Sequence, residues 1–173
     1  MRRIILLILL LTCIIGSILF LNTDFTKPVD ISVKADLIIV EKGRRLMTIY
    51  SKGIKLKSYR ISLGKDPVGD KQCQGDNKTP EGTYYIKGKD AKSRFHRSLW
   101  ISYPDAVDTR EAKRAGKNPG GGILIHGITD GYSWLGKAHL LINWTQGCIA
   151  VTNKEIEELF YLIDVGVPIR ITQ

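Results

Sequence analysis

The sequence holds 173 residues, which suits one domain with a hydrophobic core and a short appendage. Hydrophobic residues make up 43% and charged residues 25%, which excludes a disordered chain, and three cysteines are too few for a disulfide scaffold. The net charge of +9 favours anionic surroundings such as lipid head groups or wall polymers, or serves solubility alone; because no common nucleic-acid-binding motif is present, we expect no nucleic-acid partner.

The chain begins with a long apolar segment. Residues 4–21 carry no charge and follow Arg2 and Arg3. As a helix this run is roughly 27 Å long, close to the thickness of a bilayer's hydrocarbon core, and the positive charge before it orients the N-terminus inside. Because no small-x-small cleavage site ends the run, we predict that residues 1–21 form an uncleaved signal anchor. This single-pass transmembrane helix would hold the protein in the cell membrane, with the remainder facing the periplasm or the cell exterior; cleavage of the segment is the alternative.

The remainder of the chain indicates a short linker and one mainly β domain. Residues 22–33 contain Pro28 and few apolar side chains, which is typical of a linker. Residues 34–173 then alternate short apolar runs with turn residues, as strands do. The expected strands are 37–40, 46–50, 55–62, 83–87, 99–103, 123–126 and 167–172, with a polar loop over 64–80 and an exposed charged helix over 106–115.

One helix is specified in more detail by its sequence. Thr152 and Glu155 have the spacing of a capping box, in which each side chain satisfies a backbone N–H at the start of a helix. The apolar residues that follow share one face of a helix; they are Ile156, Leu159, Phe160 and Ile163. Gly166 is placed to end this helix.

Two features go beyond what a fold requires. His126 ends an apolar strand, and Cys148 follows Gly147 just before the capped helix. Taken singly, such a cysteine is more often a buried structural thiol and such a histidine a satisfied polar residue. Together they suit nucleophilic catalysis, because a histidine near a thiol withdraws its proton and the thiolate is the reactive form. A glycine-containing turn also directs backbone N–H groups toward a developing oxyanion.

The segment from Ile125 to Asn153 resembles the catalytic domain of L,D-transpeptidases of the YkuD type. That family carries a histidine-glycine pair, a variable stretch, and a serine- or threonine-led motif that ends in glycine-cysteine. In this chain the motifs are His126-Gly127 and Thr145-Gln146-Gly147-Cys148. Segments upstream are also similar to the family: Ser62-Leu63-Gly64, the loop from Gly75 to Tyr84, and Ile101-Ser102-Tyr103-Pro104. The motifs agree in order and spacing, so the resemblance covers residues 34–172.

The resemblance implies a fold, a reaction and a set of residues. The fold is a mainly β, mixed β-sandwich or barrel-like domain with one or two packed helices. Cys148 is the nucleophile, His126 its base, and the amides of Gly147 and Cys148 the oxyanion donors. The thiolate attacks the carbonyl of the third residue of a peptidoglycan stem peptide, and the terminal D-alanine leaves. An amine of a second stem then takes the acyl group and forms a crosslink, without a cofactor.

Two positions depart from the pattern of many members. Gln146 stands where a second histidine is common, which leaves His126 as the base. Ala150 stands where an arginine is common, which removes a partner for a substrate carboxylate. The acceptor therefore differs from that of many members, or the chain hydrolyses bonds as an L,D-carboxypeptidase or an amidase. A non-catalytic wall-binding module is disfavoured, because it has no use for a paired thiol and imidazole.

Further residues are candidates for contact with substrate. These are Gly127, Trp144, Gln146 and His96. Cys73 lies in the polar loop and is expected to be a free surface thiol. The three histidines lack the spacing of zinc ligands, so we expect no metal site.

Overall fold

Eight strands account for most of the ordered core. The structure is a computed structural model that describes residues 2–22 and 29–173, apart from the side chains of residues 17–22. The strands are β1 (Leu37–Glu41), β2 (Leu46–Ser51), β3 (Ile54–Arg60), β4 (Gly82–Asp90), β5 (Ser98–Ile101), β6 (Leu124–His126), β7 (Ile149–Ala150) and β8 (Pro168–Thr172). The strands predicted from the sequence are present, and β7 is an addition. The mainly β prediction is confirmed.

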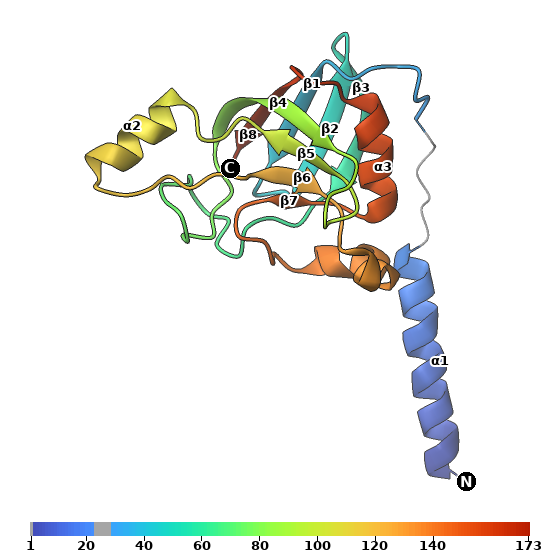
Figure 1. Cartoon of the computed structure of the whole chain (residues 1–173). Helices are drawn as coiled ribbons and strands as arrows, with labels where there is room; N and C mark the ends of the chain where they lie inside the picture. Colours follow the sequence, from blue (N-terminus) through green and yellow to red (C-terminus); the bar gives the residue numbers. More distant parts are fainter. Residues whose placement is uncertain (1, 23–28) are drawn as a thin grey trace.

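The strands form one continuous mixed sheet that curls into a half-barrel (Figure 1). Their order is β3-β2-β1-β8-β4-β5-β6-β7, so every strand is hydrogen-bonded to the next. The pairs β1–β8 and β6–β7 are parallel, and the others are antiparallel. A single curled sheet thus replaces the two layers of a sandwich, because β8 joins the N-terminal meander to the strands that carry the site.

The helix α3 (Asn153–Leu162) packs against this sheet. Its N-terminus has the predicted capping box, in which Thr152 accepts from the Glu155 amide and the Glu155 side chain accepts from the Thr152 amide. Ile156, Leu159 and Leu162 are buried in the core. The prediction that Gly166 ends the helix is wrong: Ile163 is already extended and pairs with Ala35, because burying its side chain against the sheet favours strand geometry there.

Two further helical segments lie outside the sheet. The charged helix α2 (Ala106–Arg114) is present as predicted and projects away from the sheet (Figure 1), with only Ala112 of its residues buried. The segment η1 (Asp130–Leu141) is a 3-10 helix interrupted at Gly136, where φ is 47°. The sequence did not predict η1, because its glycines and short apolar runs have no helical period.

The N-terminal helix α1 (Arg2–Asn22) contacts η1. Across residues 2–22 and 29–173, no helix has both the length and the apolar character that crossing a membrane demands, so the predicted transmembrane anchor over residues 1–21 is not confirmed. Most of the predicted linker, 22–33, falls on residues 23–28, which lie outside the described residues.

The capping box of α3 yields a stability prediction. In Thr152→Ala, the hydroxyl that accepts from the Glu155 amide (3.3 Å) and bonds the Glu155 carboxylate (2.7 Å) is lost. We expect the free energy of unfolding to fall by about 1 kcal/mol. Urea denaturation should show a lower midpoint with an unchanged slope. Glu155→Gln keeps an acceptor for the Thr152 amide and should cost less. An equal loss in both variants would contradict this account.

Candidate active site

His126 is held in one orientation and one tautomer at the end of β6. Its side chain is 1% exposed. Its Nδ1 lies 2.6 Å from the carbonyl oxygen of Gly127. Because a carbonyl only accepts hydrogen bonds, Nδ1 carries the proton and Nε2 holds the free lone pair. The ring is therefore prepared to accept a proton at Nε2.

Aromatic rings enclose this imidazole. Phe95 stacks on it with ring centroids 4.3 Å apart, and Trp144 meets it edge-on at 5.8 Å. Burial among these groups lowers the pKa of His126 to about 4, although the hydrogen bond to Gly127 acts in the opposite direction. The nearby His139 and Arg94 lower this pKa further. His126 is thus uncharged at neutral pH.

Cys148 directly precedes β7, which pairs in parallel with β6. His126 is paired with Ala150, two residues after Cys148. His126 and Cys148 both line one cleft. The thiol donates to the carbonyl of Gly122 at 3.6 Å. Burial raises the pKa of Cys148, an effect opposed by a hydrogen bond from the Leu124 amide and by the charges of Lys71 and Arg94.

The turn before Cys148 is closed by the side chain of Thr145. Its hydroxyl donates to the carbonyl of Cys148 at 2.7 Å and accepts from the amide of Gly147 at 3.1 Å. Gly147 has a φ of +130°, and a Cβ there would lie 2.6 Å from the carbonyl oxygen of Lys78, so only glycine fits. The Gly147 amide is already bonded, which corrects its predicted oxyanion role. The Cys148 amide has no acceptor among the described residues and remains as a donor.

The cleft above these groups has a volume of about 440 Å³ and a cationic lining. The cations are Lys65, Lys71 and Arg94, and none of the lining residues is acidic. Lys71 is paired with Asp76 outside the lining at 2.7 Å, whereas Lys65 and Arg94 are exposed. The site thus combines an uncharged thiol, an uncharged base and a positive field. That combination suits acyl transfer from an anionic carbonyl substrate.

The other predicted site residues divide into two groups. Trp144 and the exposed Gln146 line the cleft with Cys148. His96 does not line it, because its two ring nitrogens are each 2.7 Å from a carboxylate, of Asp130 and of Glu157. Those carboxylates raise the pKa of His96 against the effect of its burial. His96 therefore links η1 to α3, and its contact with substrate stays a prediction.

Gly127 also lies outside the cleft lining. A Cβ at this position would stand 2.5 Å from Oδ1 of Asn153, so the glycine serves close packing between β6 and α3. Its carbonyl nevertheless acts on the site, since it fixes the tautomer of His126. Cys73 is a free thiol, as predicted, but it is half-buried rather than on the surface. Among the described residues no cluster of metal-ligating side chains occurs.

Sequence reasoning missed several residues of the cleft. Phe95, Lys65 and Lys71 line it, as do Gly120, Gly121 and Gly122. These glycines belong to none of the motifs singled out in the sequence, although the carbonyl of Gly122 accepts from the Cys148 thiol. Arg94 also lines the cleft, directly before Phe95. The stacking of Phe95 on His126 depends on the antiparallel pairing of β5 with β6, which no local pattern reveals.

Comparisons with known proteins agree on one family. A sequence model of the YkuD family, described as the L,D-transpeptidase catalytic domain, matches residues 35–171. YafK of Escherichia coli K12, which its name assigns provisionally to the L,D-transpeptidases, is 32% identical over 177 residues. That alignment covers 94% of this chain and 64% of YafK.

Solved structures add two similar folds. The helical cell shape determining protein Pgp2 of Campylobacter jejuni matches with a TM-score of 0.61 and 26% identity, over 82% of this chain and 48% of Pgp2. Bd1075 of Bdellovibrio bacteriovorus matches with a TM-score of 0.58 and 25% identity, over 84% of this chain and 51% of Bd1075. This chain thus spans less than two thirds of the length of each of these relatives.

The pairing of His126 with Cys148 is tested by alkylation. His126→Ala removes the predicted base for the thiol proton, so iodoacetamide should modify Cys148 more slowly near neutral pH. The base form of His126 prevails above pH 4 and its help is lost below, as its pKa of about 4 requires. At strongly alkaline pH hydroxide ionises the thiol without help, and the two rates should converge. Mass spectrometry measures the rates, and equal rates at pH 7 would exclude His126 as base.

Proposed function

The chain belongs to the YkuD family of L,D-transpeptidase catalytic domains, and we propose that it crosslinks peptidoglycan stem peptides through an acyl-enzyme on Cys148. The observation that carries the proposal is a single cationic cleft lined by both the uncharged Cys148 and the uncharged His126. A wall-binding module would gain nothing from a tautomer held by a 2.6 Å hydrogen bond. Acyl transfer needs that tautomer.

The first half-reaction forms a thioester. Nε2 of His126 takes the thiol proton as the sulfur of Cys148 attacks the carbonyl carbon of the third stem residue. The carbonyl oxygen becomes an oxyanion, and the Cys148 amide is the donor placed to receive it. The tetrahedral intermediate collapses, the bond to D-alanine breaks, and the imidazolium returns its proton to the leaving amine. A base whose pKa is about 4 is a strong acid once protonated, which favours this return.

The second half-reaction reverses these roles. An amine on a second stem gives a proton to His126 and attacks the thioester carbon. An amide forms and the bond to sulfur breaks. The thiol of Cys148 then recovers the proton from His126. The same base therefore serves both halves, in agreement with a chain in which Gln146 replaces the second histidine common in the family.

The cationic lining suits the carboxylates of a stem peptide. Position 150, where many members have an arginine, is filled by an alanine that is 0% exposed in β7, and it faces no substrate. Arg94 and Lys65 are exposed in the cleft and supply the positive charge instead. Stem peptides lie outside the cytoplasmic membrane, so the periplasm or the cell exterior is the proposed site of the reaction. The likeness to Pgp2, named for helical cell shape, extends the proposal to wall shape.

Hydrolysis is the second candidate for the same site. Cys148 lines an open cleft and is not fully buried, so water also reaches a thioester formed there. If water replaces the amine and D-alanine is the leaving group, the chain acts as an L,D-carboxypeptidase. If the leaving amine belongs to an existing crosslink, the chain acts as an amidase. Product composition separates these outcomes from crosslinking.

The decisive experiment is an incubation of the protein with disaccharide-tetrapeptides, followed by mass spectrometry. Crosslinked dimers with released D-alanine are expected, because the acyl group passes from Cys148 to a second stem. Cys148→Ala should abolish dimers and D-alanine alike, since alanine has no nucleophile. Trimmed stems without dimers would show that the chain is a hydrolase and not a transferase. Products that persist in Cys148→Ala would overturn both.

The role of Arg94 is tested separately. Arg94→Ala should raise KM for the tetrapeptide about tenfold and reduce kcat less, because a charge-assisted contact with a substrate carboxylate is lost. Arg97→Ala is the matched control: that guanidinium lies over the rings of Phe160 and Tyr161, and it does not line the cleft. An equal rise in KM for both variants would show that the effect comes from the loss of one positive charge anywhere nearby, and not from a contact made by Arg94.

A further inference from the structure

Residues 65–81 form a loop that directly precedes β4 and makes one wall of the cleft. We call this segment the clamp loop. Lys65, Lys71, Gln74 and Gly75 are its lining residues. Lys42, which is 2% exposed, secures the outer parts of the loop through bonds to the carbonyls of Gly69 (2.6 Å) and Thr79 (2.9 Å). The middle of the loop depends on other contacts.

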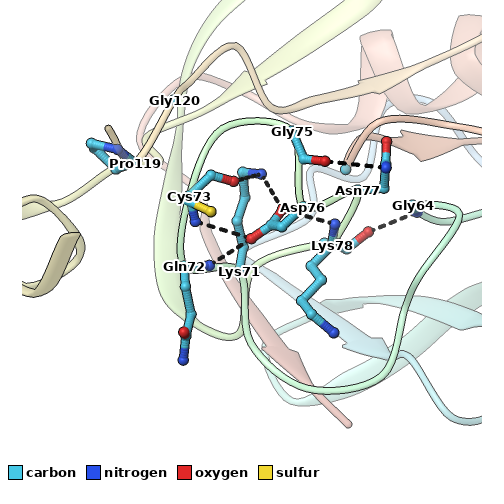
Figure 2. A network of polar contacts seen from close by, with 12 residues as sticks. Gly64, Lys71, Gln72, Cys73, Gly75, Asp76, Asn77, Lys78, Pro119 and Gly120 are labelled. Atoms are coloured by element: carbon cyan, nitrogen blue, oxygen red, sulfur yellow. Dashed lines mark hydrogen bonds and ion pairs between the residues drawn. The ribbon is translucent and has the colours of Figure 1, made fainter. Parts of the chain in front are cut away.

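A single carboxylate organises that middle part (Figure 2). Oδ1 of Asp76 accepts from Nζ of Lys71 at 2.7 Å and from the amide of Lys78 at 3.0 Å. Oδ2 accepts from the amides of Gln72 at 2.8 Å and Cys73 at 3.0 Å. Burial would raise the pKa of Asp76, but these donors outweigh it and lower the pKa to about 2. The carboxylate thus stays charged and joins 71–73 to 78.

The residues beside Asp76 press against the turn that carries the nucleophile. A Cβ on Gly147 would stand 2.6 Å from the carbonyl oxygen of Lys78, and a Cβ on Gly64 would stand 2.0 Å from that of Asn77. Gly64 in turn forms a bridge with Thr145, the residue that closes the nucleophile turn. The carbonyls of residues 77 and 78 therefore pack tightly against Gly64 and Gly147, and this packing restricts the position of the turn that carries Cys148.

The clamp loop also contacts the opposite side of the nucleophile. The Gln74 amide donates to the carbonyl of Asn118 at 2.8 Å, and a Cβ on Gly120 would stand 3.2 Å from the Gln74 side chain. Figure 2 shows Gly120 facing this part of the loop. Two residues later, the carbonyl of Gly122 accepts from the Cys148 thiol. The clamp loop thus contacts two backbone segments near the sulfur: the turn that ends at Gly147 and the segment from Asn118 to Gly120.

We propose that Asp76 is a positioning residue: by joining Lys71, Gln72, Cys73 and Lys78, it holds the clamp loop against Gly64 and Gly147 and so fixes the turn that presents Cys148. Asp76 itself does not line the cleft. The part of this inference that concerns catalysis rests on the proposed function. The part that concerns the turn does not.

The test compares Asp76→Asn with Asp66→Asn. Asparagine keeps the shape of Asp76 and removes the charge paired with Lys71. Asp66 is on the same loop, but its carboxylate is 60% exposed and its ion pair with Lys78 (2.9 Å) lies at the surface, which makes it the matched control. Hydrogen exchange by mass spectrometry reports on amides 145–148 and, as a reference, on β1 and β8. The kcat and KM for the tetrapeptide are measured on the same samples.

In Asp76→Asn, exchange over 145–148 should accelerate while β1 and β8 stay unchanged. The kcat should fall about tenfold with KM within about twofold, because a misplaced nucleophile slows the chemical step more than binding. Asp76→Glu, which keeps the charge, should recover part of the kcat and replaces Asp76→Asn if that variant does not fold. Unchanged exchange over 145–148, unchanged kcat, or an equal effect of Asp66→Asn would each overturn the inference. A wild-type protein that acts on no stem peptide would overturn the proposed function. In that case the exchange data would still show whether Asp76 fixes the turn at 145–148.

Discussion

The hydrogen bond from Nδ1 of His126 to the carbonyl of Gly127 is the interaction on which the site depends. It joins adjacent residues, so it needs no distant partner, yet it selects the tautomer whose Nε2 accepts a proton. The carbonyl brings no full charge, in contrast to a carboxylate in the same place. The ring therefore remains uncharged in its apolar surroundings of Phe95 and Trp144, and its pKa stays low.

Much of this arrangement was predictable because its signals are local. Short apolar runs gave the strands, and the Thr152–Glu155 spacing gave the start of α3. Cys148 and His126 stand in one cleft, as the motifs indicated. The differences concern the partners that polar groups find. The ring nitrogens of His96 bond Asp130 and Glu157, which lie far along the chain, whereas the Gly147 amide bonds Thr145 within its own turn. Local pattern does not show which partner a polar group finds.

The curled sheet explains how residues far apart in sequence meet at the sulfur. The parallel pair β6–β7 places His126 opposite Ala150, two residues after Cys148. The bridges of Ser62 with Ala150 and of Gly64 with Thr145 add the segment just before the clamp loop to the same edge. Glycines at positions 64, 127 and 147 allow these backbones to approach more closely than any side chain would permit. The family motifs in this sequence therefore include glycines that close backbone packing requires, as well as the reactive side chains.

An uncharged thiol beside an uncharged imidazole has a consequence for reactivity. Burial disfavours both charges, so in the proposed reaction the ion pair forms only as a substrate carbonyl takes up the developing negative charge. The cations of the cleft and the Cys148 amide then stabilise that charge where it appears. Because oxidants attack the thiolate and not the thiol, the same burial also protects Cys148 between turnovers. In the proposed reaction, reactivity is therefore coupled to substrate through desolvation of the site rather than through a permanently ionised nucleophile.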